Sequence, residues 1–121
     1  MKTVYTGVDI IEIARIEEAI KEPAFIEKIF TKAEIENCKR KNQAEYYAGR
    51  FAAKEAIYKA ISKRMEYEIL DWLDVEILSD KNGRPIINFL TGSLKRYEKR
   101  MDLSISHNRT MSVATATLVL D

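Results

Sequence analysis

Hydrophobic and polar residues alternate along the start of the chain, and the alternation then gives way to a helical spacing. Residues 3–11 are rich in Val, Ile, Thr and Tyr, which predicts a β-strand. From Ile13 onward the apolar residues Ile13, Ile16 and Ile20 recur at helical spacing, with charged residues between them. The pattern predicts a strand that runs into an amphipathic helix, and Pro23 either ends that helix or begins a short second one.

Capping and turn residues mark the elements that follow. Thr31 stands three residues before Glu34, which is the spacing of a capping box at the start of a helix. Residues 44–62 are rich in Ala, and Gly49 is the one residue among them that disfavours a helix, so this stretch predicts a long helix. The further expected elements are a strand over 72–78, a turn over 80–85, a strand over 86–89, a helix over 91–100 and a hairpin over 103–120.

This order of elements predicts an α+β fold, in which a mostly antiparallel sheet packs against a long helix. We expect one domain, residues 1–121, because this length gives room for a single core. The balance of 20 Lys and Arg against 19 Asp and Glu gives no support for non-specific nucleic-acid binding. No apolar run reaches the roughly 20 residues of a membrane span, and no signal peptide is recognisable. The lone Cys38 suits a reducing compartment, so we expect a cytoplasmic protein.

Asp9 lies in the most hydrophobic run of the chain, between Val8 and Ile10. An ionised carboxylate among residues that favour burial is costly unless another group pairs with it or binds it. A second carboxylate, Glu55, has the same problem on the helix over 44–62. At 100° per residue it projects from the edge of the small apolar sector, beside Phe51.

The other polar residues of that helix point in two different directions. Arg50, Lys54 and Tyr58 are expected to form its polar face. Lys59 follows Glu55 by one turn and does not join this face.

Two carboxylates in unfavourable surroundings suggest a shared hard cation. Mg²⁺ is typically held by one or two carboxylates together with water and substrate phosphate, and Lys59 would add a positive charge for the same phosphates. The alternative is a pair of structural ion pairs, Asp9 with an arginine such as Arg50 and Glu55 with Lys59. Periodicity alone favours the ion pairs, because structural pairs are commoner than metal sites.

Four segments resemble those of one enzyme family. "GVDIIEIARI", "AGRFAAKEAIYKAI", "NGRP" and "SISHNRTMSVATA" are similar to the holo-acyl-carrier-protein synthases, the small bacterial type of 4'-phosphopantetheinyl transferase. The similarity runs from about residue 4 to residue 118. It implies transfer of the phosphopantetheine arm of coenzyme A to a serine of apo acyl carrier protein in fatty-acid biosynthesis, with release of 3',5'-ADP. It also implies a requirement for Mg²⁺ and a homotrimer with active sites between neighbouring subunits.

The resemblance assigns roles residue by residue. Asp9 and Glu55 match the metal-binding carboxylates, Lys59 matches the catalytic lysine near the pyrophosphate, and Arg15 matches a basic residue that meets the acidic carrier protein. The positions implied for coenzyme A binding are Arg50, Lys59, Asn82, Gly83, Arg84, Pro85, Ser106 and His107.

Some roles stay open at this level. The general base is either Glu55, acting through a water, or a water on the metal. A lone histidine at a strand end is more often structural than functional, and only the resemblance favours coenzyme A binding by His107. The basic run Lys39-Arg40-Lys41 is either a solvated connection or a contact for phosphate or carrier.

One segment departs from the family. A glycine-rich stretch often follows the lysine helix, whereas "ISKRMEYEILDWLDV" contains no glycine. This departure is the best support for an alternative function, a non-catalytic module that binds coenzyme A or a carrier protein. A related transferase for secondary-metabolite carriers is a further alternative, but that type is usually about twice as long.

Overall fold

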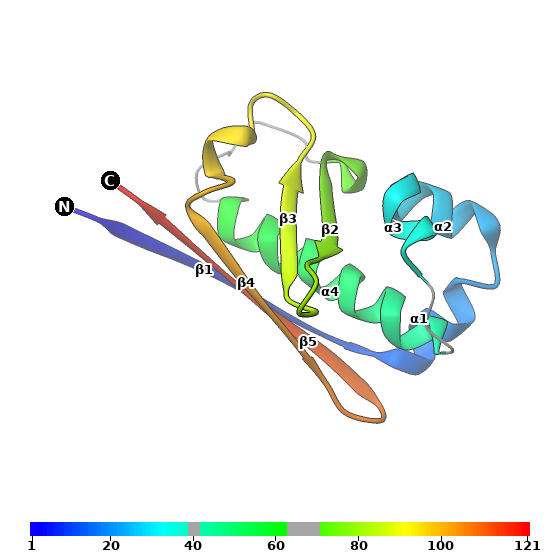
Figure 1. The fold of residues 1–121 in the computed structure, drawn as a ribbon. Coiled ribbons are helices and arrows are strands. Elements are labelled where there is room, and N and C mark those ends of the chain that lie inside the picture. The colour runs from blue at the N-terminus through cyan, green and yellow to red at the C-terminus, as the bar shows by residue number, and fades with distance from the viewer. Residues whose placement is uncertain (39–41, 63–70) are drawn as a thin grey trace.

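The computed structural model describes residues 1–38, 42–62 and 71–121. The run Lys39-Arg40-Lys41 and the centre of the glycine-free segment, 63–70, lie outside the described residues. The elements are β1 (Thr3–Glu12), α1 (Ile13–Ala19), α2 (Pro23–Ile29), α3 (Lys32–Glu36), α4 (Gln43–Ser62), η1 (Trp72–Asp74), β2 (Val75–Ser79), β3 (Pro85–Phe89), η2 (Lys95–Tyr97), β4 (Met101–His107) and β5 (Met111–Leu120) (Figure 1).

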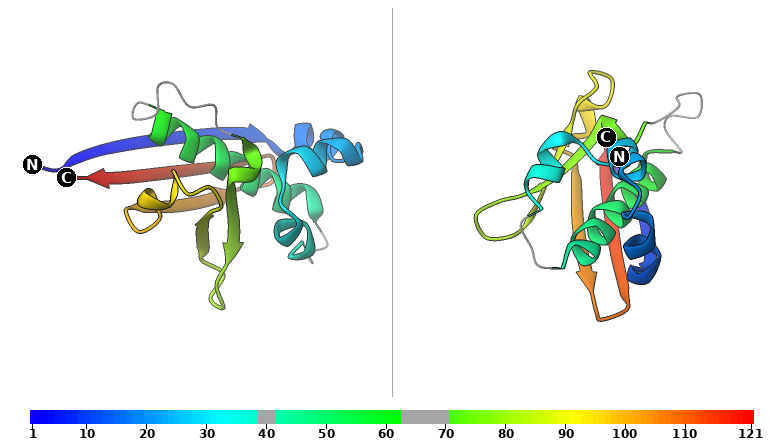
Figure 2. Two further views of the ribbon diagram at one scale, coloured as in Figure 1. Left: turned by 90° about the horizontal axis from the view of Figure 1, so that it is seen from above. Right: turned by 90° about the vertical axis from the view of Figure 1, so that its right-hand side faces the viewer.

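Two antiparallel sheets hold α4 between them. The larger sheet has the strand order β1-β5-β4, and the smaller one is the β2–β3 hairpin. The long helix α4 lies across one face of the larger sheet, as Figures 1 and 2 show from different sides. The architecture is α+β, with antiparallel sheets packed against one long helix, as the sequence predicts.

The helix approaches β1 very closely at Gly7. A Cβ atom at this position would stand 1.9 Å from the backbone oxygen of Ala56, so only glycine fits. The facing positions on α4, Ala52, Ala56 and Ala60, are at most 1% exposed. This close contact fixes where α4 crosses β1, and it brings the last two turns of the helix beside Asp9.

The opposite face of the larger sheet remains open along β1. Val4, Val8 and Ile10 are 59%, 56% and 62% exposed there. Side chains alternate between the two faces of a strand, so the neighbouring Asp9 points to the helix side.

The polar face predicted for α4 is wrong. Lys54 is completely buried and Arg50 is 7% exposed, because α3, β2 and η1 cover this side of the helix. The Lys54 ammonium donates to the backbone oxygens of Ile29 and Trp72 at 2.7 and 3.0 Å and to Glu34 Oε1 at 2.7 Å. Helical periodicity identifies which residues share a face, but it does not show what covers that face.

Most expected elements are confirmed near their predicted bounds. Pro23 begins α2, and the capping box of α3 is formed by Thr31 and Glu34 as expected. The strand predicted from residue 72 begins only at Val75, because Asp71 caps a short 3₁₀ turn, η1, in front of it.

The helix expected over 91–100 is also wrong. That segment contains one 3₁₀ turn, η2, flanked by further turns. Leu94 and Tyr97 are both buried. Their spacing of three residues suits either an α-helix or a 3₁₀ turn, so the sequence pattern alone does not separate the two.

Candidate active site

Asp9, Glu55 and Lys59 come together where α4 crosses β1. Lys59 Nζ lies 3.2 Å from Asp9 Oδ1 and 2.9 Å from the backbone oxygen of Val8. The Asp9 side chain is 17% exposed and that of Lys59 is 53% exposed, so the pair lies at the edge of the helix–sheet contact. Glu55 precedes Lys59 by one turn of α4 and is half-buried.

The two carboxylates act on each other electrostatically. Burial raises the pKa of Glu55 above its usual 4.5, the charge of Asp9 raises it further, and Lys59 partly offsets both effects. Asp9 and Glu55 are 46 positions apart in the chain, and Lys59 links them in space, because it pairs with Asp9 and follows Glu55 by one turn of α4. Lys59 therefore serves both carboxylates, as the partner of Asp9 and as a nearby positive charge for Glu55.

The donor set fits a magnesium ion. The charge of Asp9 destabilises the ionised form of Glu55. A divalent cation bound by both carboxylates would remove this repulsion. Among the residues that the structure describes, no group of three or more His, Cys, Asp or Glu side chains is placed to hold a metal. An ion on Asp9 and Glu55 would thus take its other ligands from water and substrate phosphate, as Mg²⁺ commonly does.

Glu55→Gln is expected to stabilise the folded chain at neutral pH when divalent cations are absent. The pKa of Glu55 is raised on folding, so the native state favours the protonated carboxyl group. The stability that protonated Glu55 contributes is fully present below its unfolded-state pKa of 4.5. It is lost as the pH rises through the pKa of Glu55 in the folded state. Gln mimics the protonated form and should add less than about 1 kcal/mol at pH 7, since the site is partly solvated. Thermal unfolding from pH 4 to pH 8 measures the gain, and a gain that fails to shrink toward pH 4 would contradict the assignment.

A second group of predicted residues lies elsewhere around α4. Arg50 Nη2 donates to Ser79 Oγ at 2.7 Å, at the end of β2, and its guanidinium covers the ring of Tyr46. The hairpin turn that follows Ser79 contains Asn82, Gly83, Arg84 and Pro85. Asp80 Oδ1 accepts from the backbone N–H groups of Asn82 and Arg84, and Gly83 has a φ of +82°.

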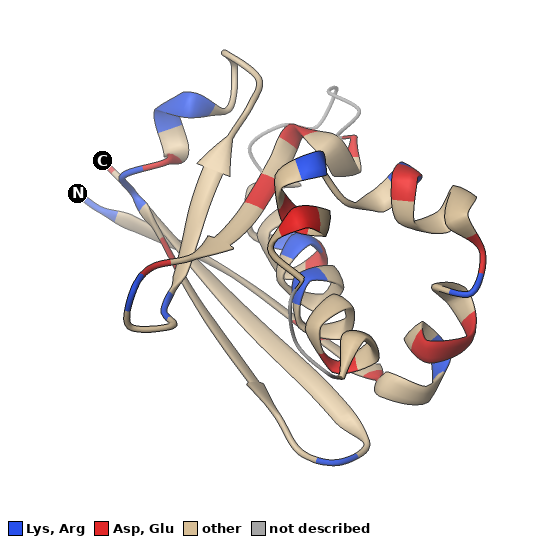
Figure 3. Cartoon of the chain, turned by 45° about the vertical axis from the view of Figure 1, so that its right-hand side comes forward, with Lys and Arg blue, Asp and Glu red and all other residues tan. Residues whose placement is uncertain are grey.

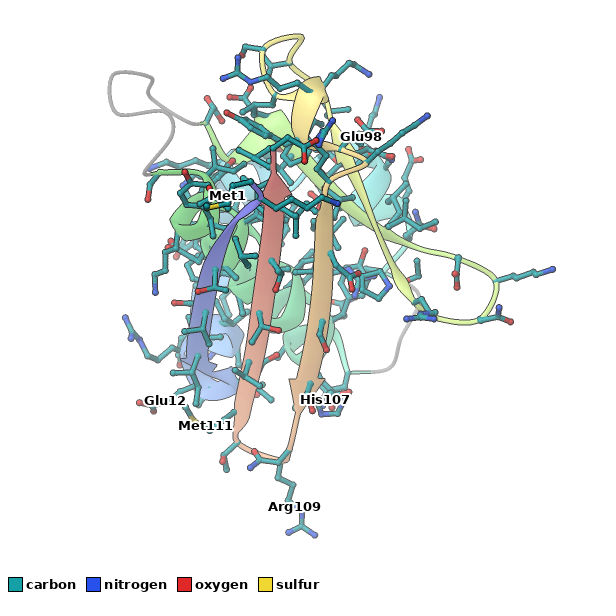
Figure 4. The ribbon with its side chains drawn as sticks, turned by 90° about the vertical axis from the view of Figure 1, so that its left-hand side faces the viewer. Met1, Glu12, Glu98, His107, Arg109 and Met111 are labelled. Atoms are coloured by element: carbon teal, nitrogen blue, oxygen red, sulfur yellow. The ribbon has the colours of Figure 1, made fainter. Side chains whose placement is uncertain are left out.

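His107 ends β4 beside the first turn of α4 (Figure 4). Its Nε2 lies 3.1 Å from Glu45 Oε1. Ser106, the preceding residue of the same strand, is exposed and points to the other face of the sheet.

One chain therefore does not gather all the predicted residues at one point. Arg50 and Glu55 are five positions apart on α4 and point about 140° apart. Arg50 faces the β2–β3 hairpin, whereas Glu55 faces β1. Asp9 and Lys59 are in contact, with Glu55 one turn earlier on α4, whereas Arg50 contacts the end of β2 and His107 contacts Glu45.

Arg15 is exposed on α1, six positions after Asp9. Figure 3 shows both acidic and basic positions on the first helices of the chain, α1 and α2. The exposed acidic residues of this surface are Glu12, Glu17, Glu18, Glu22 and Glu27, and the basic ones are Arg15, Lys21 and Lys28.

An aromatic stack joins this surface to the site. Phe25 of α2 stacks on Phe51 of α4 at 6.3 Å between ring centroids, and Phe51 stacks on Trp72 at 5.0 Å. The helical spacing predicts that Phe51 lies beside Glu55, one turn before it. Nothing in the sequence predicts that Phe25 and Trp72 stack on Phe51. The contact between His107 and Glu45 could not be predicted either, because the two residues belong to different elements, β4 and α4.

Comparison with known proteins identifies the family of this chain. Residues 5–116 match the model of the 4'-phosphopantetheinyl transferase superfamily, and the chain belongs to this superfamily. A holo-[acyl-carrier-protein] synthase of Fusobacterium nucleatum is 42% identical over 120 residues, which cover 93% of this chain and 96% of that protein.

Solved structures of holo-acyl-carrier-protein synthases are also similar to this chain. A holo-(acyl-carrier-protein) synthase from Bacillus anthracis, in complex with CoA (3',5'-ADP), is 34% identical and has a TM-score of 0.79, with 100% of both chains covered. The apo structure of the Chronobacterium ammoiniagenes synthase has a TM-score of 0.84 at 26% identity and covers 100% of this chain and 99% of that chain. Across the described part of the present chain, no helix is long and apolar enough to cross a membrane.

Proposed function

We propose that this chain transfers 4'-phosphopantetheine from coenzyme A to a serine of apo acyl carrier protein and releases 3',5'-ADP. The observation that carries the proposal is the convergence of Asp9, Glu55 and Lys59 in a chain that matches holo-acyl-carrier-protein synthases over nearly its whole length. Coenzyme A is named in the complexes of homologous synthases, which supports it as the donor. We place the activity in fatty-acid biosynthesis, as the resemblance implies, and in the cytoplasm, which the lone Cys38 favours.

In the reaction, the serine oxygen attacks the β-phosphorus of coenzyme A, and the bond from that phosphorus to the bridging oxygen breaks. The electron pair leaves with the α-phosphate of 3',5'-ADP. Lys59, which pairs with Asp9, would neutralise the charge that develops there. We assign the serine proton to Glu55, which would accept it through a water.

Asp9 and Glu55 would together hold Mg²⁺ at this site. The ion, when bound, supplies Lewis-acid stabilisation of pyrophosphate oxygens. The negative charges of both carboxylates would then be balanced by the ion and by Lys59.

The separation of the predicted residues into two halves supports a site completed by a second subunit. Arg50, the hairpin turn and His107 would meet Asp9, Glu55 and Lys59 of a neighbouring chain in a homotrimer. The exposed residues Val4, Val8 and Ile10 form an apolar strip on β1 that association would bury.

The experiment that tests the function is a mass measurement of apo acyl carrier protein after incubation with this chain, coenzyme A and Mg²⁺. A mass gain equal to one phosphopantetheine group supports transfer. Binding of coenzyme A without any mass gain would favour the non-catalytic module. The comparisons favour transfer, because the homologues that match over nearly the whole chain are named as synthases.

Arg15→Glu is expected to raise KM for the carrier protein about three- to tenfold, with little change in KM for coenzyme A. Arg15 is an exposed cation on a surface with several glutamates, so reversing its charge leaves little to attract an acidic partner. Initial rates at varied carrier concentration measure the effect. Lys99→Glu, an equal charge reversal on the turn before β4, is the control. An equal rise in both KM values would show that Arg15 has a structural role instead.

A further inference from the structure

The histidine of the predicted coenzyme A site already has an anionic partner within the chain. His107 Nε2 lies 3.1 Å from Glu45 Oε1, and the side chains are 43% and 25% exposed. The contact joins the last residue of β4 to the first turn of α4. Because both side chains are partly exposed, a ligand from solvent can reach the ring.

The start of α4 holds Glu45 in place. The backbone N–H of Glu45 donates to Asn42 Oδ1 at 3.0 Å, and Asn42 Nδ2 lies 3.5 Å from Glu45 Oε2. One carboxylate oxygen thus faces the helix cap and the other faces His107. The position of this charge is set by the helix start, not by a freely rotating side chain.

This arrangement limits how an anion can approach His107. The Nε2 atom faces Glu45, and Nδ1 lies 3.4 Å from the backbone oxygen of Asn108. A phosphate oxygen that binds Nε2 must replace Glu45 Oε1, because one N–H group cannot serve both at full strength. A phosphate that binds Nδ1 would stand across the ring from the same carboxylate and would be repelled by it.

We propose that the Glu45 carboxylate competes with a phosphate group of coenzyme A for His107. The inference rests on the proposed function, in which His107 meets coenzyme A. Binding would then be an exchange in which the ligand phosphate takes the place of the Glu45 carboxylate on the imidazole. The competing phosphate is either the monoester on the ribose or the pyrophosphate, and both carry the required negative charge.

Glu45→Gln tests this exchange. The amide keeps the size of the side chain and an oxygen that accepts from Nε2, but it removes the charge. We expect the Kd for coenzyme A, measured by calorimetry, to fall about fivefold, the size expected for two like charges a few ångström apart in a solvated site. The gain should shrink as the salt concentration rises to about 0.5 M.

Dephospho-coenzyme A, which lacks the ribose phosphate, separates the two sources. A gain limited to coenzyme A identifies the monoester, and a gain with both ligands identifies the pyrophosphate. Either result supports the exchange.

Two further variants complete the design. Asp102→Asn removes an equal charge from an exposed position on the same strand, five residues before His107, and should leave Kd unchanged. In a His107→Gln background, the gain from Glu45→Gln should disappear.

Three results would overturn the inference. They are an unchanged Kd in Glu45→Gln, weaker binding in that variant, and a gain that persists without His107. If the unmodified chain does not bind coenzyme A at all, the proposed function itself fails.

Discussion

Asp9→Asn is expected to lower kcat for phosphopantetheine transfer about 10³-fold while the protein remains folded. The substitution removes the carboxylate that pairs with Lys59, one of the two that we propose hold the metal. A divalent ion at such a pair contributes several kcal/mol of transition-state charge stabilisation, which corresponds to a loss of this size. Asn keeps the shape of the side chain, so the contact between β1 and α4 at Gly7 should not change.

Glu55→Gln should cause a comparable loss, and the double variant should lose little more than either single one. Residues that act as one unit show strongly non-additive effects on rate. Transfer is measured as the fraction of apo carrier converted at saturating coenzyme A and Mg²⁺, and unfolding curves confirm the fold of each variant. Glu36→Gln, which neutralises an exposed carboxylate on α3, serves as the control. Full activity in either single variant would refute the metal assignment.

The elements with local signals could be predicted from the sequence. The alternation in β1, the alanine content of α4 and the Thr31–Glu34 capping box each depend on residues close together in the chain. The α-helix predicted around Leu94 and Tyr97 is wrong, because the spacing of these two buried residues fits a 3₁₀ turn as well as an α-helix.

The site was predictable in part for a related reason. Asp9 and Glu55 each stand out because their own neighbours are apolar, and that contrast is visible in the sequence. The sequence does not show that the ion-pair partner of Asp9 is Lys59. The pairing of Lys59 with Asp9 depends on how α4 crosses β1, and the contact of Arg50 with Ser79 depends on where the β2–β3 hairpin packs.

Lys54 shows most clearly what local patterns miss, and its replacement carries the second large expected effect. It precedes Glu55 directly and was expected on a polar face, yet neither its side chain nor that of Glu34 is exposed at all. Glu34 Oε1 also accepts from the backbone N–H of Thr31 at 2.8 Å, and its Oε2 accepts from that of Ile77 at 2.8 Å. The pair therefore joins α4 to the end of α2, to α3, to β2 and to η1.

Lys54→Met is expected to destabilise the fold by about 3–5 kcal/mol, because it leaves the Glu34 carboxylate buried without its cation. In a chain of this size the midpoint of thermal unfolding should fall by roughly 10–20 °C. The double variant Glu34→Gln with Lys54→Met should recover much of the loss, since removing both charges avoids an unpaired one. Thermal and urea unfolding of the four proteins in this cycle measure the coupling directly. A single variant within 1 kcal/mol of the unmodified chain would mean that water reaches Glu34, and the helix that carries Glu55 would then owe its orientation to Gly7 and the alanine row alone.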